Sequence, residues 1–188
     1  MHGKRPRLIE LALFAAGCSA ACAGAQTVAD ADAGERLQWR AQLGWPQACD
    51  DAFVPPEPDY GGVVVYALDG GARLVEVSCA LGAYQGAHRY YLLGAPGSAP
   101  VALRFRVLIA QRGALRREPA DELWGDAEID AAAATLTITN RYRAGGDCGT
   151  YVQYRIAAQP EVLVARAKAA CDGKSGGGPE HWPALQVD

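Results

Sequence analysis

The sequence offers few residues for nucleophilic catalysis, which needs a nucleophile, a base and a group that orients the base. Beyond residue 25 the serines are Ser78, Ser98 and Ser175, and none lies in the Gly-x-Ser-x-Gly turn of the α/β-hydrolases. A cysteine nucleophile is excluded if the four cysteines of the same part are oxidised to disulfides. Serine and cysteine hydrolases are therefore disfavoured.

Metal-dependent chemistry has one candidate segment. His88 and His181 are far apart in the sequence, and neither has a partner at the spacing of zinc ligands. Five carboxylates around Gly125 are compatible with a calcium loop or with a solvated turn and strand edge: Asp121, Glu122, Asp126, Glu128 and Asp130. Their spacing is not that of an EF-hand, so we favour the solvated turn and predict no metal and no other cofactor.

Pairs of carboxylates are the remaining catalytic possibility. Two carboxyl groups held about 5–9 Å apart can cleave a glycosidic bond, and Glu76, Glu122 and Asp147 are candidates. The sequence does not place these side chains relative to one another. An envelope enzyme that works through carboxylates such as Glu76 or Asp147 is therefore kept as an alternative.

Tyrosine and arginine side chains near predicted loops are the best candidates for a binding surface, because these residue types anchor many interfaces. The competing interpretation is ordinary sheet packing, with tyrosine hydroxyls that reach water. Asp147 also fits a turn residue whose carboxylate accepts hydrogen bonds from backbone amides. The predicted binding residues are Tyr84, Gln85, Tyr91, Arg141, Asp147 and Tyr151.

Residues 1–25 have the layout of a secretory signal peptide. Basic residues at positions 4–7 precede a short apolar run and a small-residue end at Ala23-Gly24-Ala25, after which we predict cleavage. The apolar run of about ten residues is too short to span a bilayer, which needs about 20. Residues 15–18 loosely resemble a lipoprotein box, so lipidation at Cys18 is the alternative. We therefore predict a periplasmic or secreted protein or, in the alternative, a membrane-anchored lipoprotein.

The remaining chain has the length of one domain and a mildly acidic charge. Removal of residues 1–25 leaves 163 of 188 residues and changes the net charge from −3 to −5, since three basic residues and one acidic residue are lost. Without a run of basic residues, binding to nucleic acid or to anionic membranes is disfavoured. We predict a flexible leader at residues 26–33 and one domain at residues 34–185.

Alternating apolar and polar residues predict a mainly β domain with an antiparallel sheet, arranged as a sandwich, a barrel or a blade-like sheet. A short helix is expected at residues 34–43, ended by Gly44-Trp45-Pro46. We expect the tail from Gly173 to be loose, with packing of Trp182 and Pro183 as the alternative. The predicted strands are residues 63–68, 73–79, 90–93, 101–109, 135–139, 151–157 and 162–170.

Cys49, Cys79, Cys148 and Cys171 predict two disulfides, because an even number of cysteines is typical of exported domains. In a hairpin the numbers of paired residues add up to a constant. A turn centred between Gln159 and Pro160 gives 319, the total for 148 and 171, so Cys148 is predicted to face Cys171. Cys49 is then left to pair with Cys79.

Several segments occur in an order and spacing that resemble a known family. The most specific are Cys79-Ala-Leu-Gly-Ala-Tyr-Gln85 and Gly146-Asp-Cys-Gly149, with Leu43-Gly-Trp-Pro46 and Trp182-Pro183 near the two ends. Over roughly residues 34–185 the chain resembles the exported bacterial family catalogued as domain of unknown function 1176. The family tends toward Gly-Leu-Gly where this chain has Ala144-Gly145-Gly146. The resemblance implies an exported, cysteine-stapled domain and supplies no activity and no catalytic residues.

A non-catalytic binding module of the cell envelope is the function that these observations favour. Its expected partner is a protein, a glycan or another envelope component. The alternatives are the carboxylate enzyme described above and an inhibitor of a hydrolase, a role that small disulfide-braced β proteins can fill. Ionisable side chains that converge in a deep pocket would favour the enzyme, and a patch of tyrosine and arginine would favour binding.

Overall fold

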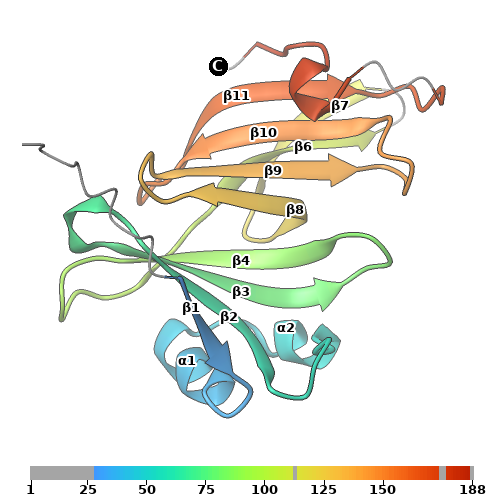
Figure 1. Cartoon of the computed structure of the whole chain (residues 1–188). Helices are drawn as coiled ribbons and strands as arrows, with labels where there is room; N and C mark the ends of the chain where they lie inside the picture. Colours follow the sequence, from blue (N-terminus) through green and yellow to red (C-terminus); the bar gives the residue numbers. More distant parts are fainter. Residues whose placement is uncertain (1–27, 112–113, 174–176, 187–188) are drawn as a thin grey trace, which may run out of the picture.

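Antiparallel β-strands make up nearly half of the described residues (Figure 1). The computed structural model describes residues 28–111, 114–173 and 177–186. Two short helices, α1 (Arg36–Leu43) and α2 (Gln47–Ala52), follow the first strand. The strands are β1 (Val28–Asp32), β2 (Tyr60–Ala67), β3 (Arg73–Leu81), β4 (Gly86–Leu93), β5 (Val101–Ala102), β6 (Phe105–Gln111), β7 (Ala114–Ala120), β8 (Leu123–Asp130), β9 (Thr135–Arg141), β10 (Gly149–Arg155) and β11 (Glu161–Lys168). The predicted fold class, mainly β and antiparallel, is confirmed.

Most strands join one sheet, while β6 and β7 form a separate hairpin. The order in the sheet is β1-β2-β3-β4-β8-β9-β10-β11, with β5 paired to β4. Strands β4 and β8 meet over three residue pairs only. Gly125 pairs with Gly86 in this seam, and the position requires glycine because a Cβ there would be 2.6 Å from the carbonyl oxygen of Thr139 on β9. The short seam divides the sheet into an N-terminal part, β1–β5, and a C-terminal part, β8–β11.

Several segments differ from the expectations drawn from the sequence. Residues Val28–Asp32, expected within a flexible leader, form β1 and pair with β2, since backbone pairing does not require alternating side chains. Helix α2 and strands β7 and β8 were not predicted, and the strand expected at 101–109 is divided into β5 and β6. The predicted signal peptide and the alternative lipidation site, Cys18, lie outside the described residues.

One hydrophobic cluster lies between the helices and the N-terminal part of the sheet, at the lower side of Figure 1. Helix α1 ends at Gly44, which has a positive φ of 71° and donates its backbone N–H to the Arg40 carbonyl. The turn that follows brings Trp45 into the cluster, where it is 2% exposed. The other members are Ala31, Leu43, Cys49, Val63, Val75, Val77, Cys79, Tyr91 and Leu93.

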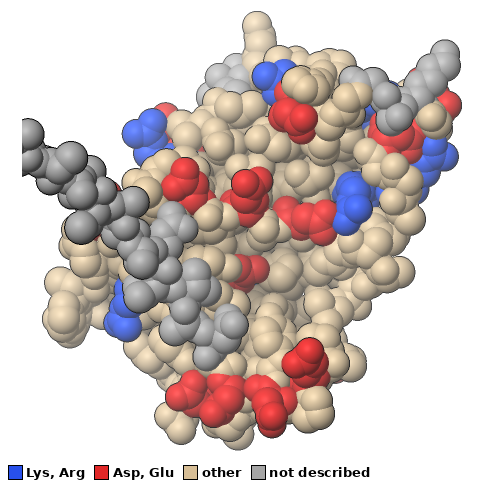
Figure 2. Space-filling view, in the orientation of Figure 1, with Lys and Arg blue, Asp and Glu red and all other residues tan. Residues whose placement is uncertain are grey.

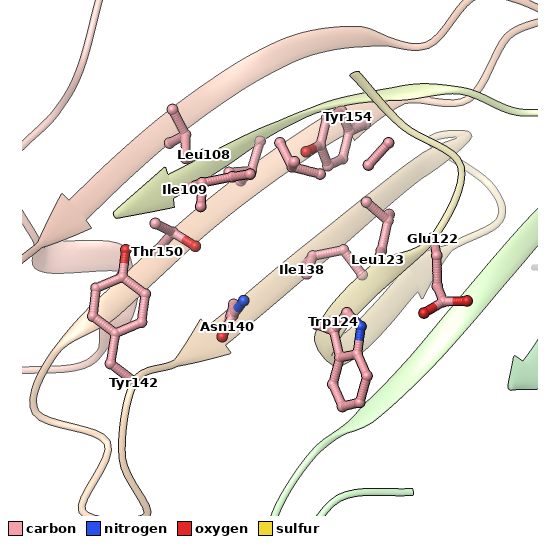
Figure 3. A pocket seen from close by; sticks show the side chains of 13 residues that line it. Leu108, Ile109, Glu122, Leu123, Trp124, Ile138, Asn140, Tyr142, Thr150 and Tyr154 are labelled. Carbon is pink, nitrogen blue, oxygen red and sulfur yellow. The ribbon is translucent and has the colours of Figure 1, made fainter. Parts of the chain in front are cut away.

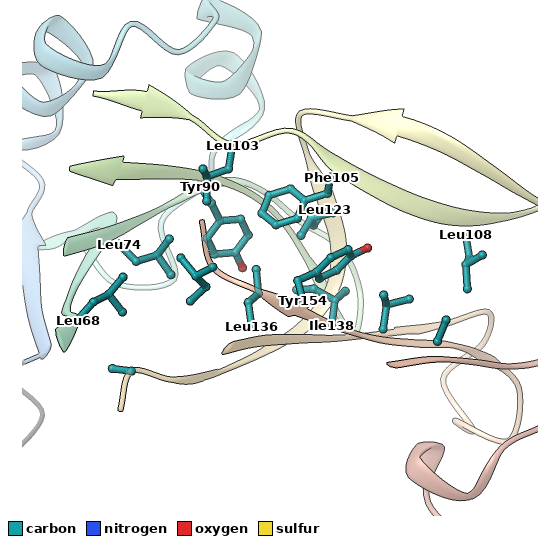
Figure 4. Close-up of a cluster of buried hydrophobic side chains, with 14 residues drawn as sticks. Leu68, Leu74, Tyr90, Leu103, Phe105, Leu108, Leu123, Leu136, Ile138 and Tyr154 are labelled. Carbon is teal, nitrogen blue, oxygen red and sulfur yellow. The ribbon is translucent and has the colours of Figure 1, made fainter. Parts of the chain in front are cut away.

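A second, larger cluster joins the two parts of the sheet to strand β6 (Figure 4). Its centre is a row of aromatic rings in edge-to-face contact. The centroids of Tyr90 and Phe105 are 5.7 Å apart, and those of Phe105 and Tyr154 are 5.0 Å apart. Because these rings come from β4, β6 and β10, the cluster fixes the β6–β7 hairpin against the sheet.

Both predicted disulfides are confirmed, although the predicted hairpin register is wrong. Cys49 is bonded to Cys79, and Cys148 to Cys171. In the hairpin, Gly149 pairs with Lys168 and Arg155 with Glu161, which differs from the predicted register by two or three residues. A bulge between Gln153 and Tyr154 shifts the pairing further. Cys171 therefore reaches Cys148 from beyond the end of β11.

The C-terminal segment packs against the sheet. A 3-10 turn at Pro179–His181 leads to Trp182, which is 4% exposed, and Arg166 and Ala184 form an isolated β-bridge. The loose tail expected from Gly173 is therefore wrong for residues 179–184, and the alternative, in which Trp182 packs against the sheet, is confirmed. Within the described ranges, no helix is long and apolar enough to cross a membrane.

Candidate functional site

A cavity of about 540 Å³ lies between the β6–β7 hairpin and the inner face of strands β8–β10 (Figure 3). Its volume falls within the range of small-molecule sites in proteins. Most of its lining is aliphatic or aromatic. The lining residues are Val107, Leu108, Ile109, Ala120, Glu122, Leu123, Trp124, Ile138, Asn140, Tyr142, Thr150, Val152 and Tyr154.

The side chains of β9 and β10 that form the floor of this cavity are set by strand alternation. The polarity of this floor changes along the strands. Directly opposite residues of antiparallel strands lie on the same face of the sheet. Ile138 pairs with Val152, and Asn140 pairs with Thr150 one step further toward the end of β9. Tyr142 follows at the same spacing. The floor therefore changes from apolar to polar toward the loop that begins at Tyr142.

Strand β6 closes the cavity from the other side. The Tyr154 hydroxyl donates to the Arg106 carbonyl at 3.0 Å, which ties β10 to β6. Burial raises the pKa of Tyr154, so its hydroxyl remains a donor in this contact. Leu108 is 9% exposed, whereas Ile109 is 40% exposed. Leu108 is thus a buried contact of the hairpin with the rest of the molecule, and Ile109 lies at the partly open rim of the cavity.

The polar end of the cavity contains a hydroxyl group without a partner. The Tyr142 hydroxyl oxygen is buried and forms no hydrogen bond in the described part of the molecule. Burial also raises the pKa of Tyr142. Gln85 donates from Nε2 to the Asn140 Oδ1 at 3.0 Å, so it engages the oxygen of that amide. A buried hydroxyl without a partner is costly, and a bound ligand is one way to satisfy it.

The sequence matches the family model described as "Protein of unknown function (DUF1176)" over residues 15–187. The chain belongs to this family. The resemblance predicted from the cysteine-containing segments is confirmed, and DUF1176 membership assigns no activity. A search of curated proteins and a search of solved structures each found no match. The function of this DUF1176 domain must therefore be argued from its own residues.

Three of the predicted binding residues come together at the seam between the two parts of the sheet. Arg141 donates from Nη2 to the Tyr84 carbonyl at 2.8 Å, and its guanidinium lies 5.8 Å from the centroid of the Tyr84 ring. The Gln85 side chain accepts from the Arg141 backbone N–H at 3.0 Å. Tyr151 pairs with Thr139 on β9, two residues from Arg141. These contacts hold the loop before β4 against the end of β9, next to the polar end of the cavity.

The last two of the six predicted binding residues, Tyr91 and Asp147, are buried. Tyr91 is 3% exposed in the cluster beneath the helices. Asp147 is 6% exposed and accepts two bonds of 2.6 Å from Arg143 and one of 2.7 Å from the Gly173 backbone. The bond from Arg143 is the main reason that the pKa of Asp147 lies well below its usual range. These contacts fit the alternative interpretation of Asp147 as a turn residue, and we leave both residues out of the candidate site.

The five acidic residues around Gly125 belong to β8 or directly precede it. Three of them form ion pairs with arginines: Glu122 with Arg89, Asp121 with Arg104, and Asp126 with Arg141. Acidic side chains also gather on the face shown in Figure 2. Among the residues that the structure describes, no group of three or more potential ligands is arranged to hold a metal ion.

The three carboxylates considered for catalysis have separate partners. Glu122 pairs with Arg89, and Asp147 pairs with Arg143. Glu76 is 6% exposed and accepts from the Tyr66 hydroxyl at 2.8 Å, with Nδ1 of His88 2.8 Å from its Oε1. Strand register explains this group, because Glu76 faces Tyr90 across β3 and β4 while Ser78 faces His88.

Reasoning from the sequence missed the residues that build the cavity. Asn140, Tyr142 and Thr150 were not among the predicted binding residues. The alternation of residues 135–139 continues through Asn140 and Tyr142 and could have placed both side chains on the inner face. No pattern in the sequence predicted that β6 lies opposite that face.

Proposed function

We propose that this protein is an exported, non-catalytic binding module that holds a small, largely apolar molecule in the cavity between the β6–β7 hairpin and strands β8–β10. The observation that carries the proposal is the cavity itself. It has a volume of about 540 Å³, a mostly apolar lining and a buried Tyr142 hydroxyl without a partner among the described residues. A few polar groups in an apolar cavity are typical of ligand sites.

Two observations support the exported part of the proposal. The chain contains two disulfides, which persist mainly in oxidising compartments. Residues 1–25 also have the order of a signal peptide. We propose a periplasmic or secreted location on these two grounds.

Binding can be tested with a neutral fluorescent probe, N-phenyl-1-naphthylamine, and the oxidised protein. We expect saturable binding with enhanced fluorescence. Ile109→Trp should weaken it by about tenfold or more, because a bulky ring on the rim fills part of the cavity. Val101→Trp is the matched control, since Val101 is 39% exposed, compared with 40% for Ile109, and does not line the cavity.

The proposal is wrong if the folded wild-type protein does not bind the probe. It is also wrong if the two tryptophan variants bind it as the wild type does. Circular dichroism of each variant establishes that the fold is retained. Mass spectrometry of an organic extract of the protein, purified from a bacterial periplasm, would then identify any molecule carried through purification.

An acid–base enzyme is the second candidate, and the contact between Glu76 and His88 favours it. A carboxylate close to Nδ1 of a histidine can support Nε2 as a base, and here the two groups lie 2.8 Å apart without a well-directed hydrogen bond. Chromogenic ester and glycoside substrates test this candidate. Turnover by the wild type that is lost in both His88→Ala and Glu76→Gln would support it, while probe binding should be unchanged in these variants.

A further inference from the structure

The charge of the cavity lining restricts the chemistry of a ligand. Glu122 is the one lining residue with a charged side chain, and no lysine, arginine or histidine of the described part lines the cavity. The Glu122 side chain is 31% exposed and has its ion-pair partner, Arg89, outside the lining. A buried anion needs a cation or several donors to replace its hydration. A carboxylate or phosphate ligand would instead share the cavity with another negative charge.

The polar end of the cavity is rich in hydrogen-bond donors. The Tyr142 hydroxyl has no partner in the described part of the chain, and the Asn140 oxygen is engaged by Gln85, which leaves its amide nitrogen as a donor. Thr150 adds a hydroxyl on the opposite strand. Figure 3 shows these three side chains toward one end of the cavity, with Glu122 and Trp124 toward the other. The arrangement suits an acceptor oxygen at the end distant from Glu122.

The apolar part of the cavity sets the shape of the rest of the ligand. Along β9 the lining continues from Tyr142 to Ile138, a distance of about 13 Å at the usual rise of a strand. Val152 and Leu108 bound this stretch from the neighbouring strand and from the hairpin. An elongated hydrocarbon body fits these walls better than a polar one, because most of the lining offers no hydrogen-bond partner.

On the basis of the proposed function, we propose that the ligand is an uncharged, elongated apolar molecule whose carbonyl-type oxygen, as in an ester, amide or ketone, accepts hydrogen bonds from Tyr142 and Asn140. The deprotonated acid of the same chain length should bind more weakly, because the lining offers no cation to compensate its charge and adds the carboxylate of Glu122. Burial keeps the Tyr142 hydroxyl protonated at neutral pH, because it raises the pKa of that group.

Dodecanoic acid and its methyl ester are a matched pair for testing this inference, through displacement of the bound probe at pH 8. The ester should displace the probe at a concentration about tenfold or more below that of the acid. Glu122→Gln should reduce the difference between the displacing concentrations of the acid and the ester, because it improves displacement by the acid. Tyr142→Phe should weaken the ester about fivefold or more, which corresponds to the loss of one hydrogen bond, and should weaken the probe less, because the probe has no acceptor oxygen.

The outcomes separate this inference from the proposed function. Equal or tighter binding of the acid would overturn the inference while the binding function stands. A Tyr142→Phe variant that binds the ester as the wild type does, or loses ester and probe affinity to the same extent, would overturn the assignment of the polar end. Failure of the wild type to bind either the probe or the ester would overturn the proposed function as well.

Discussion

The imidazole of His88 lies against the buried carboxylate of Glu76, with 2.8 Å between Nδ1 and Oε1. The contact is at ion-pair distance and is not a well-directed hydrogen bond. Tyr66 and Tyr90 also direct their hydroxyls at the carboxylate, at 2.8 and 3.5 Å. Glu76 is thus the common acceptor for side chains from β2 and β4.

Removal of this acceptor should destabilise the fold. We expect Glu76→Ala to lower the free energy of unfolding by about 2–4 kcal/mol, because it removes the acceptor of the Tyr66 and Tyr90 hydroxyls and the carboxylate beside His88. Urea unfolding followed by circular dichroism measures the change. Glu57→Ala, at an exposed position, is the control and should change the stability by less than about 0.5 kcal/mol. Similar values for the two variants would contradict the role assigned to Glu76.

Arg36 should be more sensitive to replacement than its neighbour Arg40. Its guanidinium donates to Asp50 at 3.0 Å and to the Gly61 and Ser78 carbonyls at 2.9 and 3.1 Å, and it lies 4.0 Å from the centroid of the Phe53 ring. A lysine cannot reproduce this planar set of bonds. We expect Arg36→Lys to cost about 2–4 kcal/mol of unfolding free energy.

Arg40→Lys is the matched control for that experiment. Arg40 forms an ion pair with the same Asp50, at 3.2 Å, but its side chain is 32% exposed. Ion pairs of this kind contribute about 0–1 kcal/mol. Chemical unfolding measures the free energy of unfolding lost in each lysine variant. Equal losses would show that the buried hydrogen bonds of Arg36 do not make it more important for stability than Arg40.

Asp147 should make the stability of the protein depend on acidic pH. Its pKa is lower in the folded protein than in the unfolded chain, mainly because of the bond from Arg143. The resulting stabilisation is complete above the unfolded pKa of about 3.9 and is lost as the pH falls toward the folded value. The melting temperature of the wild type should therefore fall more steeply below about pH 4 than that of Asp147→Asn. Asp69→Asn, in an exposed turn, should retain the wild-type slope.

The two disulfides should differ in their contribution to stability. They close segments with sequence separations of 30 and 23 residues, for which loop entropy predicts similar effects of about 3–4 kcal/mol. Cys49 and Cys79 are 4% and 2% exposed and both belong to the cluster between the helices and the sheet, whereas in the second pair Cys148 is buried but Cys171 is exposed. The double alanine variant of the first pair also loses core packing. We expect it to unfold at a lower urea concentration than the double variant of Cys148 and Cys171.

Local patterns in the sequence were sufficient for much of the fold. The alternation of residues 135–139 and 151–157, and the ending of the first helix at Gly44, depend on neighbours along the chain. Strand β8 was missed because small and acidic residues such as Gly125, Ala127 and Asp126 give only a weak apolar pattern. The pairing of Cys148 with Cys171 was predicted correctly from a register that was wrong, since proximity at the open end of a hairpin tolerates a shift of a few residues.

The sequence by itself determined the β-rich class and the number of disulfides, because these follow from alternation, turns and the cysteine count. Only the tertiary structure decided that Asn140, Tyr142 and Thr150 line a cavity. Alternation assigns a side chain to one face of a sheet but does not say what covers that face. Here the cover is β6, which is held by Phe105 and by the hydrogen bond from Tyr154 to the Arg106 carbonyl. These contacts join residues nearly 50 positions apart, beyond the reach of any local pattern.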